Sequence, residues 1–167
     1  RKKVIFIINT VTPYQIDFFE KLANYVDLNV IFYSKNYQNY NFNFKKKKNH
    51  FFLCHKKKPV DFFCKFIQKV NPDLVIFGGY RLKYNSRFIS YIKKKKIKFF
   101  YWLEKLNERN YLKYKFTKYL ISKKINKADG VLAVGSNAKK MYSKYNKNTI
   151  NFPYSIKTQK QNKKNYF

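Results

Sequence analysis

A chain of 167 residues is long enough for one domain with a hydrophobic core of its own. Its 38 Lys and Arg against 8 Asp and Glu give a net charge of +30, and only four of the basic residues are Arg. No run of about 18 uncharged apolar residues and no apolar run with a small-residue cleavage site is present, so the sequence predicts neither a membrane-spanning helix nor a signal peptide. The first residue is Arg1 and not Met, so we expect that end to be trimmed or incomplete.

Short apolar runs rich in β-branched and aromatic residues alternate with amphipathic runs along the chain. Continuous apolar runs predict strands that are buried on both faces. The expected strands are Val4–Asn9, Leu28–Ser34, Phe51–Cys54, Leu74–Phe77, Ile97–Leu103, Val131–Val134 and Thr149–Phe152. The runs with helical spacing predict helices at Tyr14–Val26, Val60–Val70, Ser86–Lys94, Lys113–Lys127 and Ser136–Tyr145. The polar segment 35–49 predicts a loop.

This alternation of strand and helix predicts an α/β fold, a Rossmann-like parallel sheet with helices on both faces. Ligands of such sheets bind at the carboxyl ends of the strands. The loops expected to line a site are therefore Thr10–Tyr14, Gly78–Tyr80, Glu104–Asn110 and Gly135–Asn137.

Glycine occurs only at positions 78, 79, 130 and 135. Neither the G-x-G-x-x-G fingerprint nor a Walker loop can be written with this spacing. The sequence therefore argues against a nicotinamide or flavin Rossmann enzyme and against a P-loop ATPase.

The two cysteines, Cys54 and Cys64, lie in apolar runs and do not form a C-x-x-C pair. His50 and His55 flank Cys54, but zinc sites usually need closely paired ligands. We expect buried thiols in a reducing cytoplasm and no metal site.

Four further segments, in chain order, are TPYQIDFFEKLA (12–23), NPDLVIFGGY (71–80), ADGVLAVGSNAKKMYSKY (128–145) and INFPYSI (150–156). Together they resemble the N-terminal half of family 4 glycosyltransferases. Members of that family have the GT-B fold, in which two Rossmann-like domains face a cleft. The resemblance implies that residues 1–156 are the N-terminal, acceptor-side domain. The lysine-rich residues 157–167 are then a disordered tail or the start of a missing C-terminal domain, and Lys157 stands where the family usually has Asp.

By this resemblance, the chain is the acceptor-binding half of a retaining glycosyltransferase of the hexosyltransferase type. The complete enzyme would transfer a sugar from a nucleotide-sugar co-substrate to a glycan or lipid-linked glycan, without a tightly bound cofactor. Alone the chain is expected to be inactive, because the donor-binding domain in cis, or a partner subunit, is missing. A fragment, a frame-shifted remnant and one subunit of a split two-chain enzyme remain open. The expected location is the cytoplasm, peripheral on the inner face of the membrane.

The resemblance also assigns roles to single residues near the strand ends. Glu104 is the expected catalytic residue, because a carboxylate there could orient an acceptor hydroxyl or assist proton transfer. The alternative is a solvated loop in which Glu104, Glu108 and Arg109 form local ion pairs. The expected acceptor-binding residues are Tyr14, Gln15, Gly79, Tyr80, Arg81 and Arg109.

The residues expected on the phosphate side of the cleft are Thr12, Gly135 and Ser136. A helix that follows Gly135, capped by Ser136 or Asn137, would offer free N–H groups to an anion. The alternative for both Gly135 and the Gly78-Gly79 pair is a tight turn. Trp102 is expected in the core, because it lies inside a strand.

Two explanations of the positive charge remain open. One is attraction to a polyanion, either nucleic acid or an anionic membrane. The other is codon bias, since Lys, Asn, Phe, Tyr and Ile have codons rich in A and T. The lysine runs 45–48, 56–58 and 93–96 are then solvated faces, or they dock on an anionic bilayer with nearby Phe residues in the interface. A basic nucleic-acid-binding module is the alternative function, although no RRM, KH or helix-turn-helix pattern occurs.

Overall fold

The structure is a computed structural model that describes residues 1–9, 12–32, 51–53, 59–79, 85–106 and 111–153. All twelve expected elements are present among these residues, with ends that differ by a few positions. The strands are β1 (Lys3–Ile8), β2 (Asp27–Phe32), β3 (Phe51–Leu53), β4 (Leu74–Gly78), β5 (Lys98–Leu103), β6 (Gly130–Ala133) and β7 (Thr149–Asn151). The helices are α1 (Pro13–Leu22), α2 (Pro59–Val70), α3 (Asn85–Lys94), α4 (Tyr111–Ile125) and α5 (Ser136–Tyr142).

The seven strands form one parallel sheet in the order β3-β2-β1-β4-β5-β6-β7. The chain moves outward from β1 to β2 and β3, and then crosses to β4 on the other side of β1. The strand order therefore reverses between β1 and β4, and this switch point is where α/β sheets bind their ligands. The predicted Rossmann-like α/β fold is confirmed.

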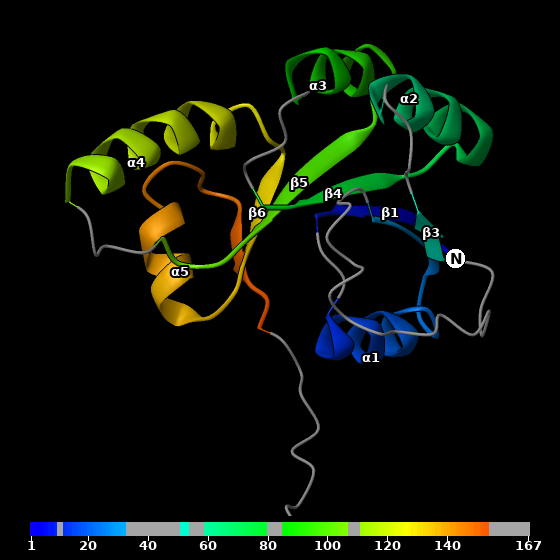
Figure 1. Cartoon of the computed structure of the whole chain (residues 1–167), viewed down its shortest axis with the longest axis horizontal. Coiled ribbons are helices and arrows are strands. Elements are labelled where there is room, and N and C mark those ends of the chain that lie inside the picture. Colours follow the sequence, from blue (N-terminus) through cyan, green and yellow to red (C-terminus); the bar gives the residue numbers. More distant parts are fainter. Residues whose placement is uncertain (10–11, 33–50, 54–58, 80–84, 107–110, 154–167) are drawn as a thin grey trace, which may run out of the picture.

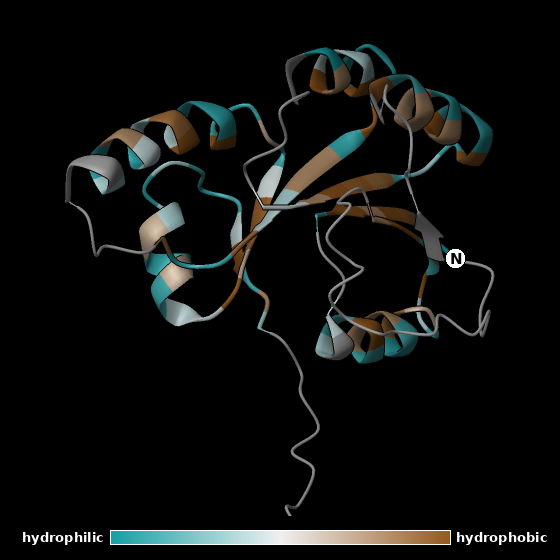
Figure 2. Cartoon of the chain, viewed as in Figure 1, coloured by the Kyte–Doolittle hydropathy of each residue, from teal (hydrophilic) through white to brown (hydrophobic). Residues whose placement is uncertain are grey.

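Helices cover both faces of the sheet, with α1 on one face and α2 to α5 on the other. Figure 1 shows α1 on the opposite side of the strands from α2 and α3. The sheet has a hydrophobic core on each face, and alternate residues of β1 point into one or the other. Phe6 packs toward α1, whereas Ile5 and Ile7 pack toward the layer of α2 to α5. Because both faces are buried, the strands consist of nearly continuous apolar runs, and β1 and β4 are largely brown in Figure 2. Each buried Ile or Phe stabilises the fold by about 1.5–3 kcal/mol.

An aromatic cluster fills the core under α1. Trp102 is 4% exposed, and its ring centroid lies 5.5 Å from that of Phe6 and 5.3 Å from that of Phe18. Phe152, just after β7, adds its ring 5.6 Å from Phe18. The expectation that Trp102 belongs to the core is confirmed, and Phe152 fixes the chain where it leaves the sheet.

Helix α4 ends at Ile125, two residues before the predicted Lys127, and two helices end three or four residues earlier than their apolar spacing predicts. Helix α1 ends at Leu22 rather than Val26, because the N–H of Asp27 already bonds to the carbonyl of Lys2 at the start of β2. Helix α5 ends at Tyr142 rather than Tyr145. There the Asn146 amide donates to two carbonyls at the end of α4, those of Ile125 and Ala128, at 3.0 Å each. In both places tertiary hydrogen bonds compete with the next helical turn.

Candidate functional site

The carboxyl ends of the central strands bring three predicted site residues to one edge of the sheet. The N–H of Gly79, after β4, bonds to the carbonyl of Trp102 in β5 at 3.0 Å, two residues before Glu104. The N–H of Val134, before Gly135, bonds to the carbonyl of Leu103 at 2.9 Å. Gly79, Glu104 and Gly135 therefore follow three neighbouring strands in this order, with Glu104 in the middle.

Gly79 and Gly135 both have backbone angles that side chains disfavour. Their φ values are +90° and +88°, in the region that favours glycine. A Cβ atom on either residue would meet no atom of the described residues within 4 Å. The backbone conformation, and not lack of space, is therefore what requires glycine, and both backbones are open to a molecule that approaches this edge.

The start of α1 contributes polar atoms beside the β1–β4 switch point. Thr12 is the N-cap, and its carbonyl accepts the N–H groups of Gln15 and Ile16 at 3.1 and 3.2 Å. The side chain of Thr12 does not cap the helix. Its Oγ1 and the Oε1 of Gln15 are both buried without a hydrogen-bond partner in the part of the chain that the structure describes. A buried polar atom in this state costs about 1–3 kcal/mol.

Glu104 lies where β5 leaves the sheet, and it is exposed. Its backbone carbonyl accepts a hydrogen bond from the hydroxyl of Tyr142 at 2.7 Å. Tyr142 is 1% exposed, so α5 holds the exit of β5 through a buried side chain. This bond fixes the backbone at Glu104, whose side chain is exposed at the carboxyl edge.

The predicted cap of α5 is wrong. Its N-cap is Gly135, without a side-chain cap, whereas Ser136 is already the first helical residue and is exposed. The carbonyl of Gly135 accepts the N–H of Lys139 at 3.0 Å. The positive φ of Gly135 turns the chain so sharply that Ser136 and Asn137 enter the helix instead of capping it. Because α5 has seven residues, its dipole is a weak attraction for an anion.

The structure describes only some of the other predicted site residues. Tyr14, in the first turn of α1, is 36% exposed. Tyr80, Arg81 and Arg109 lie outside the described residues, as do Glu108, Cys54, His50, His55 and the tail 157–167.

Cys64 lies half-buried in α2. Burial, and secondarily the nearby Asp61, raises the pKa of its thiol, which disfavours a reactive thiolate. No group of three or more His, Cys, Asp or Glu residues that could hold a metal ion occurs in the described ranges. Among those same residues, no helix combines the length and apolarity needed to cross a membrane.

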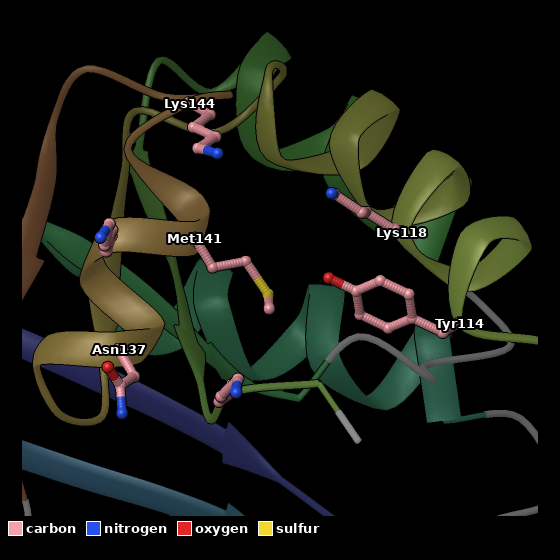
Figure 3. A pocket seen from close by; sticks show the side chains of 7 residues that line it. Tyr114, Lys118, Asn137, Met141 and Lys144 are labelled. Carbon is pink, nitrogen blue, oxygen red and sulfur yellow. The ribbon is translucent and has the colours of Figure 1, made fainter. Parts of the chain in front are cut away.

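The sequence analysis missed a pocket between α4 and α5, shown in Figure 3. Its volume is about 220 Å³, and it lies beside the exit of β5. The described residues that line it are Lys105, Tyr114, Lys118, Asn137, Lys140, Met141 and Lys144. The available sequence signal was the spacing of four between Tyr114 and Lys118 and between Lys140 and Lys144, which predicts that each pair shares one helix face.

Comparison with known proteins identifies no family. No protein-family model matches the chain, and no curated protein sequence matches it. A solved UDP-N-acetylglucosamine 2-epimerase aligns with 89% of this chain and 47% of its own, at 14% identity and a TM-score of 0.57. A putative UDP-N-acetylglucosamine 2-epimerase from Listeria monocytogenes aligns with 84% of this chain and 41% of its own, at 13% identity and a TM-score of 0.51.

A short-chain dehydrogenase/reductase from Veillonella parvula DSM 2008 also matches, over 80% of this chain and 68% of its own, at 8% identity and a TM-score of 0.52. At these identities the likeness shows the fold alone, a Rossmann-like α/β domain. The chain spans less than half the length of either epimerase.

Proposed function

We propose that this chain is the acceptor-binding, N-terminal half of a family 4-like glycosyltransferase, which transfers a sugar from a nucleotide sugar to a glycan or lipid-linked glycan. The observation that carries the proposal is the meeting of Gly79, Glu104 and Gly135 at one sheet edge, beside the β1–β4 switch point. Gly79 and Gly135 belong to two of the four family-like segments, which are distant in sequence and thereby meet in one place. The name of the structurally similar epimerase refers to a nucleotide sugar, which agrees with this class of substrate.

Glu104 is the residue that we propose for the chemistry. Its exposed carboxylate would orient the acceptor hydroxyl and accept its proton as the oxygen attacks the sugar. The bond from Tyr142 fixes the backbone at Glu104, which limits the positions the carboxylate can take. Such positioning of a base against the reacting hydroxyl lowers the entropic cost of the reaction.

The start of α1 would bind the acceptor. Tyr14 and Gln15 lie in its first turn. The Oε1 of Gln15 and the Oγ1 of Thr12, which have no partner among the described residues, would turn toward the ligand to accept hydrogen bonds from sugar hydroxyls. Gly79 leaves its backbone open to the same ligand. Tyr80, Arg81 and Arg109 keep their proposed acceptor-binding roles, while Thr12, Gly135 and Ser136 would face the phosphates of the donor.

The donor itself would be held by a second Rossmann-like half, in cis or in a partner subunit. Positive groups and helix dipoles would stabilise the leaving diphosphate, without an obligatory metal. The chain alone should therefore not turn over a nucleotide sugar.

The acceptor would be presented at an anionic membrane surface, and the outer side of α4 supports this part of the proposal. Phe116, Tyr119 and Leu120 are 65%, 55% and 43% exposed, and their spacing puts them on one helix face. Five of the 15 residues of α4 are Lys and none is acidic. The ammonium of Lys123 lies 4.4 Å from the centre of the Tyr119 ring. Apolar side chains bordered by lysines are typical of helices that lie in a membrane interface.

A glycan array tests the proposed acceptor role. The full chain should bind a discrete set of oligosaccharides at physiological salt, and Gln15→Ala should weaken that binding at least tenfold. The matched control Gln68→Ala, on the exposed side of α2, should change it less than twofold. Binding to no glycan, or release of sugar from UDP-glucose, UDP-N-acetylglucosamine or GDP-mannose by the chain alone, would refute the proposal. Salt-sensitive binding to DNA and RNA of any sequence, without glycan binding, would favour the nucleic-acid alternative.

A further inference from the structure

The pocket between α4 and α5 is lined by positive charge. Lys105, Lys118, Lys140 and Lys144 contribute four ammonium groups, and none of the described lining residues is acidic. A concave site with charges of one sign concentrates the electric field and attracts a counter-ion more strongly than a flat surface does. The lining therefore selects for an anion.

The two helices direct side chains into the gap between them. In Figure 3, the ammonium of Lys118 and the hydroxyl of Tyr114 extend from α4 toward α5, and Met141 extends from α5 toward α4. Lys144 projects from the end of α5 on the same side. Ligand groups between the helices would thus meet donors from both of them.

Two tyrosines lie beside the ammonium of Lys118. Its pKa is raised by electrostatic attraction to Tyr145 and Tyr114, and hydrogen bonds with the two phenol oxygens act in the same direction. The ammonium also lies 5.5 Å from the centre of the Tyr114 ring. The two tyrosines therefore position the cation while they leave its charge intact.

The size and composition of the pocket restrict the anion. A volume of about 220 Å³ is below the 300–1,000 Å³ of pockets that enclose a drug-sized ligand, so a whole nucleotide sugar does not fit. Lysine binds phosphate as a point charge, and a phosphate group offers several charged oxygens to the four lysines of the described lining, whereas a carboxylate offers two. Met141 and the Tyr114 ring provide an apolar wall for a small carbon group.

We propose that this pocket binds the phosphate or diphosphate group of a small ligand. The group would lie among Lys118, Lys140 and Lys144, with Tyr114 and Asn137 as neutral hydrogen-bond partners. This site goes beyond the proposed sugar transfer, because it lies between two helices and not over the β1–β4 switch point. A soluble phosphorylated metabolite and a phospholipid headgroup carry the same chemistry.

Calorimetric titration of the full chain with inorganic pyrophosphate at 150 mM salt tests the site. Pyrophosphate should bind saturably at one site, and the double substitution Lys118→Gln with Lys144→Gln should weaken it at least tenfold. The control is Lys94→Gln with Lys95→Gln at the exposed end of α3, which removes the same charge and should change binding less than twofold. Thermal unfolding of both variants checks that they are folded.

Vesicles distinguish the two sources of the phosphate group. The chain is mixed with phosphatidylcholine vesicles with and without phosphatidic acid, and pyrophosphate is then added as competitor. Release by pyrophosphate, together with weaker vesicle binding of the pocket variant than of the control, would assign a lipid headgroup. Pyrophosphate binding without such release would assign a soluble ligand. Equal losses in the pocket and control variants, or no saturable binding of either probe, would overturn the proposal. Glycan binding is measured in a separate experiment, so a failure of the phosphate site can be distinguished from a failure of the proposed acceptor-binding function.

Discussion

Asp73 and Asp129 hold equivalent positions at the amino edge of the sheet, one before β4 and the other before β6. The Asp73 carboxylate accepts the N–H of Lys3 at 2.8 Å, and its own N–H donates to the carbonyl of Lys3 at 2.9 Å. Asp129 makes the same pair of bonds with Phe99, at 2.8 and 3.0 Å. Each aspartate thus fixes the start of the neighbouring strand. The acidic residues of two family-like segments are therefore structural, and they lie at the opposite end of the strands from Glu104.

Asp73→Asn should destabilise the fold in a pH-dependent way. The N–H of Lys3, and next the ammonium of Lys2 at 3.1 Å, lower the pKa of Asp73 below its ordinary value of 3.8. A lowered pKa gives stability that is fully present above the ordinary value and is lost as the pH falls through the lowered one. Urea unfolding from pH 3 to pH 7 should show a constant deficit of the variant at neutral pH that shrinks below about pH 4. The control Asp17→Asn, on the exposed side of α1, should show a smaller deficit at neutral pH.

Lys96→Gly should stabilise the chain, although it removes a side chain. Lys96 has a φ of +56°, and it ends α3 in a Schellman motif in which the N–H of Ile97 bonds to the carbonyl of Ile92 at 3.1 Å. A left-handed residue costs about 1–2 kcal/mol unless it is glycine, so the free energy of unfolding should rise by about 1 kcal/mol. The same change inside the helix, Lys93→Gly, should lower it by about 1 kcal/mol. Effects of equal sign in the two variants would contradict this account.

Tyr142→Phe removes the hydroxyl that fixes the exit of β5. The lost hydrogen bond to the Glu104 carbonyl should lower the free energy of unfolding by about 0.5–1.5 kcal/mol. If Glu104 acts on the acceptor hydroxyl, the same change should slow sugar transfer by the complete enzyme more than it weakens glycan binding. Tyr25→Phe is the control, because Tyr25 is 77% exposed and its loss should affect neither quantity. An unchanged rate of sugar transfer in the Tyr142 variant would show that this hydrogen bond does not contribute to the reaction.

Two classes of sequence signal predicted the fold well. Continuous apolar runs such as that of β1 predicted strands, because a parallel sheet covered on both faces has no polar side. The strand–helix order then predicted which residues meet at the carboxyl edge. Both signals are local or periodic, so one sequence is sufficient to see them.

The features that the sequence did not predict depend on three-dimensional contacts. Ser136 is a good capping residue by type, but the φ of Gly135 decides that the glycine occupies the cap. The lysine pocket was hidden because lysine is so frequent here that spacing alone does not separate a lining residue from a solvated one. Only the packing of α4 against α5 makes that distinction.

Phe116→Ser combined with Leu120→Ser should reduce binding to vesicles that contain anionic lipid by about tenfold or more. Each side chain buries several CH₂ or ring groups in the interface, at about 0.8 kcal/mol per CH₂. Because both residues are largely exposed in the folded chain, the free energy of unfolding should stay within about 0.5 kcal/mol of the parent. Sedimentation with vesicles measures the binding, and Tyr25→Ser is the control on the exposed turn after α1. If the double variant and the Tyr25→Ser control bind the vesicles equally well, lysine charge alone accounts for the attraction.

Gly79→Ala and Gly79→Asn separate the role of the backbone at the candidate site from that of space. At a φ of +90° alanine is strained and should cost about 1–2 kcal/mol of unfolding free energy, although its Cβ would meet no atom within 4 Å in the part of the chain that the structure describes. Asparagine tolerates left-handed conformations better, so it should cost less. If the open backbone of Gly79 contacts the acceptor, both side chains should weaken glycan binding, and the bulkier asparagine should weaken it more. Stability and binding would then rank the two variants in opposite orders, which a purely structural glycine would not produce.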